Sequence, residues 1–134
     1  MSEARSLAFA AQCVSVEDEA DAWRVAFADR EFNARLYLLL RRDRAPSAED
    51  VELGLDGYHV EVNDEANSAH GGIASFELHR DRVVVEFEEE MAEAFGGVTS
   101  LSVSFALRDR QFAELRDRLA RVFEGDHCFL DCAE

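Results

Sequence analysis

The side chains best suited to chemistry are four histidines and three cysteines: His59, His70, His79, His127, Cys13, Cys128 and Cys132. The tail DHCFLDCAE places His127 beside Cys128 and, at C-x-x-x-C spacing, close to Cys132, a pattern that could bind a soft metal. Zinc sites usually add a second pair of ligands, and none accompanies this one. We therefore expect no metal and no cofactor, with the tail forming a short terminal strand.

Clustered carboxylates are the next candidates for catalysis. The run Glu88-Glu89-Glu90 could orient a water or a metal, but it also opens a predicted helix, where each charge gains ~0.3–1 kcal/mol from the helix dipole. The pair Asp64-Glu65 falls in a predicted turn. Acidic groups spread over several turns favour a surface that meets a basic partner.

The stretch NSAHGGIASFEL, residues 67–78, has the glycines of a ligand loop but not its other parts. A phosphate loop needs G-x-x-x-x-G-K-[ST], and this chain contains no lysine. No G-x-S-x-G nucleophile motif occurs either. We expect Asn63, Gly71 and Gly72 to form a structural turn between two strands, and we expect no catalysis.

The net charge of the chain indicates which classes of partner it can bind. The 29 acidic residues outweigh the 14 basic ones, giving a net charge of −15. Such a balance repels nucleic acid and anionic lipid, and it steers basic partners toward the protein. The N-terminus predicts no signal peptide and the longest apolar run, residues 36–40, is too short for a membrane span. We expect a cytoplasmic protein that binds neither nucleic acid nor membrane.

The spacing of hydrophobic residues predicts the strands and helices that position these side chains. Alternating apolar residues predict strands around residues 22–28, 58–63 and 101–107, and an apolar run predicts a central strand at 36–40. Helical spacing predicts a short helix near 88–95 and a C-terminal helix near 109–124. Short turns favour antiparallel pairing. The expected fold is a single α+β domain over residues 1–134, mainly antiparallel sheet with the C-terminal helix packed on one face.

From Tyr58 to Leu78 the chain reads YHVEVNDEANSAHGGIASFEL, followed by RDRVVVEF, and this run resembles the immunity protein 10 family of bacterial polymorphic toxin systems. The similarity extends from about residue 8 to 124, through SLSVSFAL and FAELRDRLARVF. Asn63, Gly71 and Gly72 match the family's central turn, whereas His70 stands where an aromatic residue is common. The resemblance implies a small non-enzymatic protein that binds a cognate toxin and occludes its active site.

The acidic balance agrees with a basic toxin domain as partner, with nucleases one class of target. Two other classes remain open: a small metal-assisted hydrolase using acidic residues with His70 or His127, and a ligand-binding or scaffold domain that forms a homodimer through a strand edge. We expect a monomer or a weak homodimer. The candidate partner-binding residues are exposed acids in turns and the loop before the glycines: Glu61, Asp64, Glu65, Asn67, His70, Glu88 and Glu89.

Overall fold

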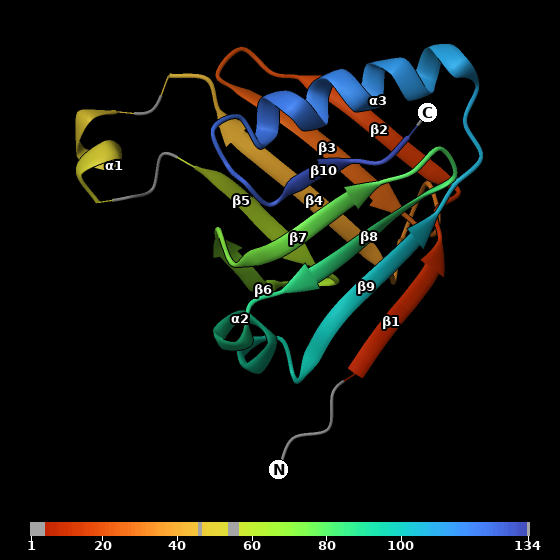
Figure 1. The fold of residues 1–134 in the computed structure, drawn as a ribbon, viewed down its shortest axis with the longest axis horizontal. Helices are drawn as coiled ribbons and strands as arrows, with labels where there is room; N and C mark the ends of the chain where they lie inside the picture. The colour runs from red at the N-terminus through yellow and green to blue at the C-terminus, as the bar shows by residue number, and fades with distance from the viewer. Residues whose placement is uncertain (1–4, 46, 54–56, 134) are drawn as a thin grey trace.

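Two five-stranded sheets face each other in the computed structural model, which describes residues 5–45, 47–53 and 57–133 (Figure 1). The first sheet has the order β1-β9-β8-β7-β10. Its strands are β1 (Arg5–Ala10), β9 (Val98–Ser104), β8 (Arg82–Phe87), β7 (Ile73–Leu78) and β10 (Phe129–Asp131). The second sheet has the order β2-β3-β4-β5-β6. Its strands are β2 (Cys13–Asp18), β3 (Ala22–Ala28), β4 (Tyr37–Asp43), β5 (Tyr58–Val62) and β6 (Asp64–His70).

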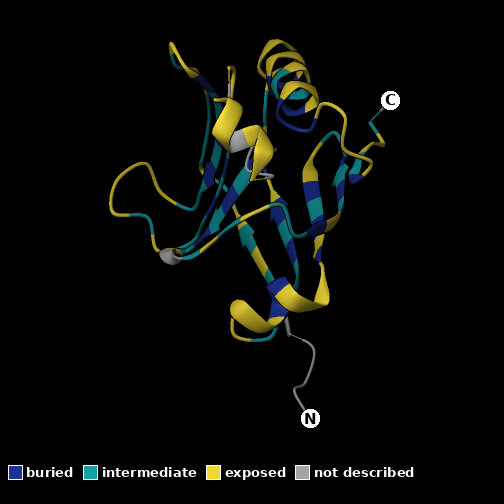
Figure 2. Ribbon diagram, turned by 90° about the vertical axis from the view of Figure 1, so that its left-hand side faces the viewer, coloured by how far each residue is buried: buried dark blue, intermediate teal, exposed yellow. Residues whose placement is uncertain are grey.

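The alternation of apolar and polar residues turns one face of each sheet inward. In the β2–β6 sheet, Val25, Leu40 and Val60 lie side by side at one level of the ladder, and all three are fully buried. In the other sheet, Phe76, Val85 and Leu101 form the corresponding row. The inward rows meet in one hydrophobic core (Figure 2). The outward rows are therefore left to solvent or to partners.

Helix α3 (Asp109–Val122) covers the core where the two sheets diverge, above them in Figure 2. Its buried side chains recur at helical spacing: Phe112, Leu115, Leu119 and Val122. The next residue, Phe123, has its ring 4.9 Å from Tyr58 of one sheet and 4.9 Å from Phe76 of the other. Aromatic contacts at such distances add to the burial energy, so Phe123 joins both sheets to the helix.

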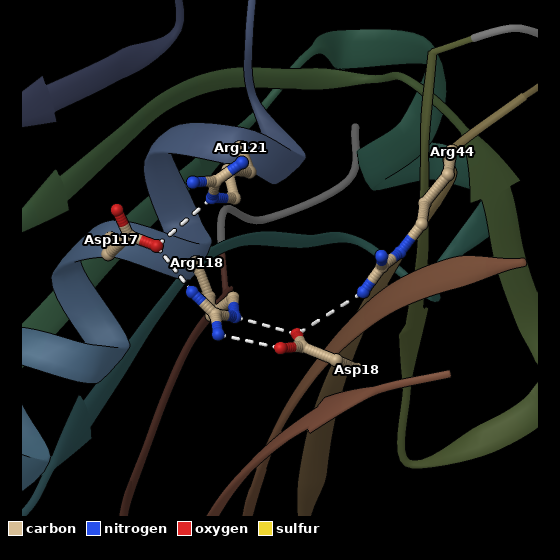
Figure 3. Close-up of polar contacts among 5 residues, drawn as sticks. All are labelled: Asp18, Arg44, Asp117, Arg118 and Arg121. Carbon is tan, nitrogen blue, oxygen red and sulfur yellow. Dashed lines mark hydrogen bonds and ion pairs between the residues drawn. The ribbon is translucent and has the colours of Figure 1, made fainter. Parts of the chain in front are cut away.

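Ion pairs fix α3 to the edge of the second sheet (Figure 3). The Arg118 guanidinium donates two hydrogen bonds of 2.6 Å to the Asp18 carboxylate of β2, and Arg44 lies 3.9 Å from the same carboxylate. Asp117 accepts from Arg118 and from Arg121. The Arg118 hydrogen bond lowers the pKa of Asp18, so this contact keeps its charge in mildly acid solution.

The chain passes from one sheet to the other at two corners. At the first, Ala11 N donates to Ser104 O in the β1 sheet, and Gln12 N donates to Ala28 O in the other sheet. The second corner is the pair Gly71-Gly72, both at positive φ. A Cβ on Gly72 would lie 2.4 Å from the Met91 sulfur, so only glycine fits there.

The predicted fold class, an α+β protein of mainly antiparallel sheet, is confirmed, and so are both predicted helices, as α2 (Glu89–Ala94) and α3. A further short helix, α1 (Ala48–Glu52), follows β4. None of the described helices is long and apolar enough to cross a membrane.

The strand pairing contains three features that the periodicity did not predict. The edge strands β1 and β10 pair in parallel with β9 and β7. Residues 64–70 form strand β6, although they were expected to belong to a turn. The turn residues Asn63, Gly71 and Gly72 bracket this strand, and each has a positive φ. Gly71 and Gly72 thus make a corner between sheets rather than a link between paired strands.

Candidate partner-binding site

The outward side of the β2–β6 sheet gathers polar and aromatic side chains from strands that are distant in sequence. We call this surface the histidine face and define it by the outward residues Tyr37, Leu39, Arg41, His59, Glu61, Ser68 and His70. They alternate with the buried residues of the same strands, which settles their direction. Helix α3 lies on the inner side of this sheet, where it contacts Asp18 and Arg42.

The two histidines at the centre of this face are direct cross-strand neighbours. His59 of β5 pairs in register with His70 of β6, and their ring centroids lie 4.9 Å apart at an interplanar angle of 67°. Burial lowers the pKa of His59, and the nearby His70 lowers it further. A neutral His59 can both donate and accept a hydrogen bond, which suits it to recognition at neutral pH.

A shallow depression of about 240 Å³ opens beside the histidines, lined by Arg41, Asp43, Gly57, His59 and His70. The Nε atom of Arg41 is buried and has no hydrogen-bond partner among the described residues. The carboxylates of Asp21 and Asp43 lie 3.9 and 3.8 Å from the Arg41 guanidinium, beyond hydrogen-bond distance. This buried donor therefore lacks a hydrogen bond within the described part of the chain, while the two carboxylates balance the charge of the guanidinium.

At the opposite end of the face, Tyr37 and Glu61 form a fixed pair. The Tyr37 hydroxyl donates to Glu61 Oε2 at 2.5 Å, and the backbone nitrogen of Tyr37 donates to Asn63 Oδ1 at 2.7 Å. Asn63 adopts φ 62°, a left-handed conformation that asparagine tolerates better than most residues. Asn63 thus holds the β5–β6 turn against the start of β4.

The loop before β4, residues 29–36, presents an aromatic ring at this end. Asp29 Oδ1 accepts hydrogen bonds from the backbone nitrogens of Arg35 and Leu36, at 3.1 and 3.2 Å, which closes the base of the loop. Phe32 near its tip is 76% exposed. Such an exposed aromatic side chain on a closed loop is typical of a binding anchor.

The predicted partner-binding residues are only partly brought together. Glu61 and His70 share the histidine face, on adjacent strands. Asp64 is exposed at the start of β6 and Asn67 is half-buried within it. Glu65 also belongs to β6, but its side chain lies outside the described part of the structure.

The other two predicted residues, Glu88 and Glu89, lie past the Gly71-Gly72 corner, exposed at the start of α2. The backbone nitrogen of Glu88 donates to Gly72 O at 2.9 Å, so the helix begins beside the end of β6. Apart from Glu61 on β5, the predicted partner-binding residues therefore lie along β6, at the edge of its sheet, and at the start of α2.

Sequence reasoning missed Tyr37, Arg41 and His59 as members of the site, and it did not consider Phe32. His59 lies on the outward side of β5, and its pairing with His70 depends on the strand register. The tail residues do not form one ligand set. Cys128 is buried, with a pKa raised to about 12 mainly by burial, whereas Cys132 is exposed.

This arrangement can recognise a protein surface: it has two imidazoles, an arginine, a hydrogen-bonded tyrosine and, on the adjoining loop, an exposed phenylalanine. No curated protein gives a significant match to the chain. The family described as immunity protein 10 matches residues 10–113, which include every strand from β2 to β9. The chain therefore belongs to the immunity protein 10 family.

Proposed function

We propose that this protein is a non-enzymatic immunity protein that binds a cognate toxin of a bacterial polymorphic toxin system and neutralises it by covering its active site. The observation that carries the proposal is the family match over residues 10–113, which spans the whole β2–β6 sheet. In this proposal the protein acts in the cytoplasm as a monomer, and it binds one toxin domain.

The contact surface in this proposal is the histidine face. Aromatic residues and arginine are enriched at protein interfaces, and this face with its adjoining loop offers Tyr37, Arg41 and Phe32. Tyr37 and Arg41 lie on β4, which pairs with β3 on one side and with β5 on the other. Rigid side chains lose little entropy on binding, which favours tight association.

Charge supports a basic partner. Around the two arginines on the outward side of this sheet are more carboxylates than guanidinium groups: Glu17, Glu19, Asp21, Asp43 and Glu61 accompany Arg24 and Arg41. The ion pairs of Arg24 with Glu17 and Glu19 are 4.0 and 3.8 Å long and solvent-exposed, so they stabilise the fold little. These carboxylates can turn instead to cations on a toxin, including a nuclease that binds phosphate.

The partner-binding residues predicted from the sequence extend this surface. Glu61 and His70 belong to the face itself, Asp64, Glu65 and Asn67 follow its β6 edge, and Glu88 and Glu89 continue it past the corner. We propose that the toxin contacts this edge as well as the face. An edge strand can also accept an additional strand from a partner.

The test is direct binding to the toxin domain encoded beside this gene. The purified partners should form a one-to-one complex and abolish toxin activity, and the association rate should fall about tenfold or more between low and physiological salt. Absence of association at low salt would refute the proposal. A complex whose association rate does not depend on salt would refute the acidic contact but keep the immunity function.

A further inference from the structure

A second cluster of ligand-type side chains lies outside the histidine face, on the outward side of the other sheet. Glu77 lies on β7, His79 directly follows that strand, and Cys132 directly follows β10. One potential ligand atom from each lies within 4.8 Å of the others. The family match ends at residue 113, before Cys132, so it gives no expectation for this group.

The fold brings these residues together through the parallel pairing of β7 with β10 (Figure 1). The backbone nitrogen of Cys132 donates to Leu78 O at 2.8 Å, which places the cysteine beside the residue between Glu77 and His79. On the β7 side, the His79 backbone nitrogen donates to Arg82 O at 2.8 Å. Backbone hydrogen bonds therefore hold both segments before any ligand arrives.

Arg116 of α3 fixes the residues on either side of Cys132. Its guanidinium donates to the Asp131 carboxylate at 2.5 and 3.0 Å and to Ala133 O at 2.9 Å. Asp131 is thus engaged by arginine on the inner side, while the Cys132 thiol remains exposed. The strand is anchored and its sulfur is accessible.

The donor set has the chemistry of a zinc site. Thiolate, imidazole and carboxylate are the three side-chain ligands that zinc takes, whereas calcium and magnesium prefer oxygen alone. The thiolate and the carboxylate together balance the charge of a divalent cation. Three protein ligands leave a fourth position for water or for a group on another molecule.

The spacing is close to that of a coordinated ion. His79 Nε2 lies 3.3 Å from Glu77 Oε1. With metal–ligand bonds of about 2.0–2.3 Å, neighbouring ligand atoms in a tetrahedral site lie roughly 3.3–3.6 Å apart. The imidazole and carboxylate already fit this spacing, and the Cys132 sulfur lies within 4.8 Å of both ligand atoms.

We propose that Glu77, His79 and Cys132 bind one zinc ion, which clamps β10 onto β7. Binding releases the thiol proton of Cys132 to solvent as the sulfur–zinc bond forms, so affinity falls as the pH is lowered. The ion stabilises the folded state because the unfolded chain cannot hold these ligands together. This site is independent of the toxin-binding proposal.

The experiment is a zinc titration of the reduced, metal-free protein in competition with a chromophoric chelator. We expect one zinc per chain and a rise in the thermal unfolding temperature when zinc is added. Cobalt substituted for zinc should give a thiolate-to-metal charge-transfer band. Cys132→Ser should abolish that band, and Cys132→Ser and His79→Ala should each weaken zinc binding by about 100-fold or more.

Two control variants separate this site from other possible ligands. Cys13→Ser removes a cysteine on β2, and His59→Gln combined with His70→Gln removes the paired histidines; both should bind zinc as the unaltered protein does. The metal-free variants should unfold at the same temperature as the unaltered metal-free protein. Absence of stoichiometric zinc, or equal zinc affinity in Cys132→Ser, would overturn the proposal.

Discussion

The two outward faces of this sandwich differ in what they offer a partner. The histidine face presents long and polarisable side chains, among them Tyr37, Arg41 and the His59–His70 pair. The opposite surface, which we call the serine face, is the outward side of β1, β9, β8 and β7: Ser6, Ala8, Ala10, Ser75, Glu77, Arg82, Val84, Glu86, Ser100, Ser102 and Ser104. Both sheets have the same number of strands and share one core. The difference therefore lies in side-chain chemistry rather than in architecture.

Short side chains occupy the β1 and β9 part of the serine face and limit what that part can do. Ser100 Oγ donates to Ser6 Oγ at 2.9 Å, so some of its hydroxyls are already paired with each other. Serine and alanine contribute little to binding energy compared with tyrosine, arginine and phenylalanine. The comparison teaches that the alternation of buried residues alone builds two equivalent sheets, and that only the outward side chains distinguish their two exposed faces.

The largest expected effect comes from placing an arginine on each face. Ser68 on β6 and Ser104 on β9 are both exposed and outward-facing. Ser68→Arg adds bulk and positive charge against a basic toxin, so toxin affinity should fall by at least 100-fold, about 2.7 kcal/mol. Ser104→Arg is the matched control and should change the affinity by less than about twofold. Equal losses from both variants would break the comparison.

The corner that joins the two faces gives the next largest effect. Gly72→Ala meets both a φ of 91° and the Met91 sulfur, and should lower the free energy of unfolding by about 2 kcal/mol or more. Gly71→Ala has the positive φ without any atom in the way, and Gly57→Ala has neither. Chemical denaturation should rank the losses Gly72, Gly71, Gly57. If Gly72→Ala were as stable as Gly57→Ala, the corner between the two sheets would not require glycine at position 72, and this prediction would be wrong.

An exposed aromatic side chain tests the histidine face without affecting stability. Phe32→Ala should weaken toxin binding about tenfold, roughly 1.4 kcal/mol, because aromatic anchors contribute heavily to interfaces. Its 76% exposure predicts an unchanged unfolding temperature. Leu130→Ala, which truncates an apolar side chain 46% exposed on β10, is the control. Surface-plasmon measurements that show equal losses for the two variants would contradict the assignment.

The smallest expected effect is a pH dependence of stability. The pKa of His59 is lowered in the folded state, so the unfolded chain takes up a proton more readily once the pH drops toward about 6.5. The contribution of His59 to stability is complete above that pH and declines below it. His59→Gln should reduce the fall in unfolding temperature between pH 7.5 and pH 5.5. An identical fall in His59→Gln would contradict this account.

Much of the fold follows from local patterns in the chain. The alternation of Tyr58, Val60 and Val62 predicted β5, and the helical spacing of Phe112, Leu115 and Leu119 predicted α3. These segments bury one face, so their periodicity carries the signal. Strand β6 was missed because its sequence, DEANSAH, is polar and shows no apolar alternation. It forms the edge of its sheet, where polar and charged side chains are common.

Features that depend on pairing between strands far apart in the chain could not be predicted from the sequence. The chain changes sheets at Ala11 and Gln12, whose backbone nitrogens donate to strands of two different sheets. The His59–His70 contact follows from the β5–β6 register, which a bulge shifts near Val62. Similarly, Cys132 meets Glu77 only through a parallel pairing of segments far apart in the chain. Residue types alone could not show either constellation.

The central claim is that the histidine face covers the toxin. Hydrogen–deuterium exchange of the free protein and of its complex with the neighbouring toxin domain tests it most directly. The account predicts that exchange slows on complex formation in β4, β5, β6 and the loop at residues 29–36, while β8 and β9 exchange as in the free protein. Protection concentrated in β8 and β9, with β5 and β6 unchanged, would contradict it.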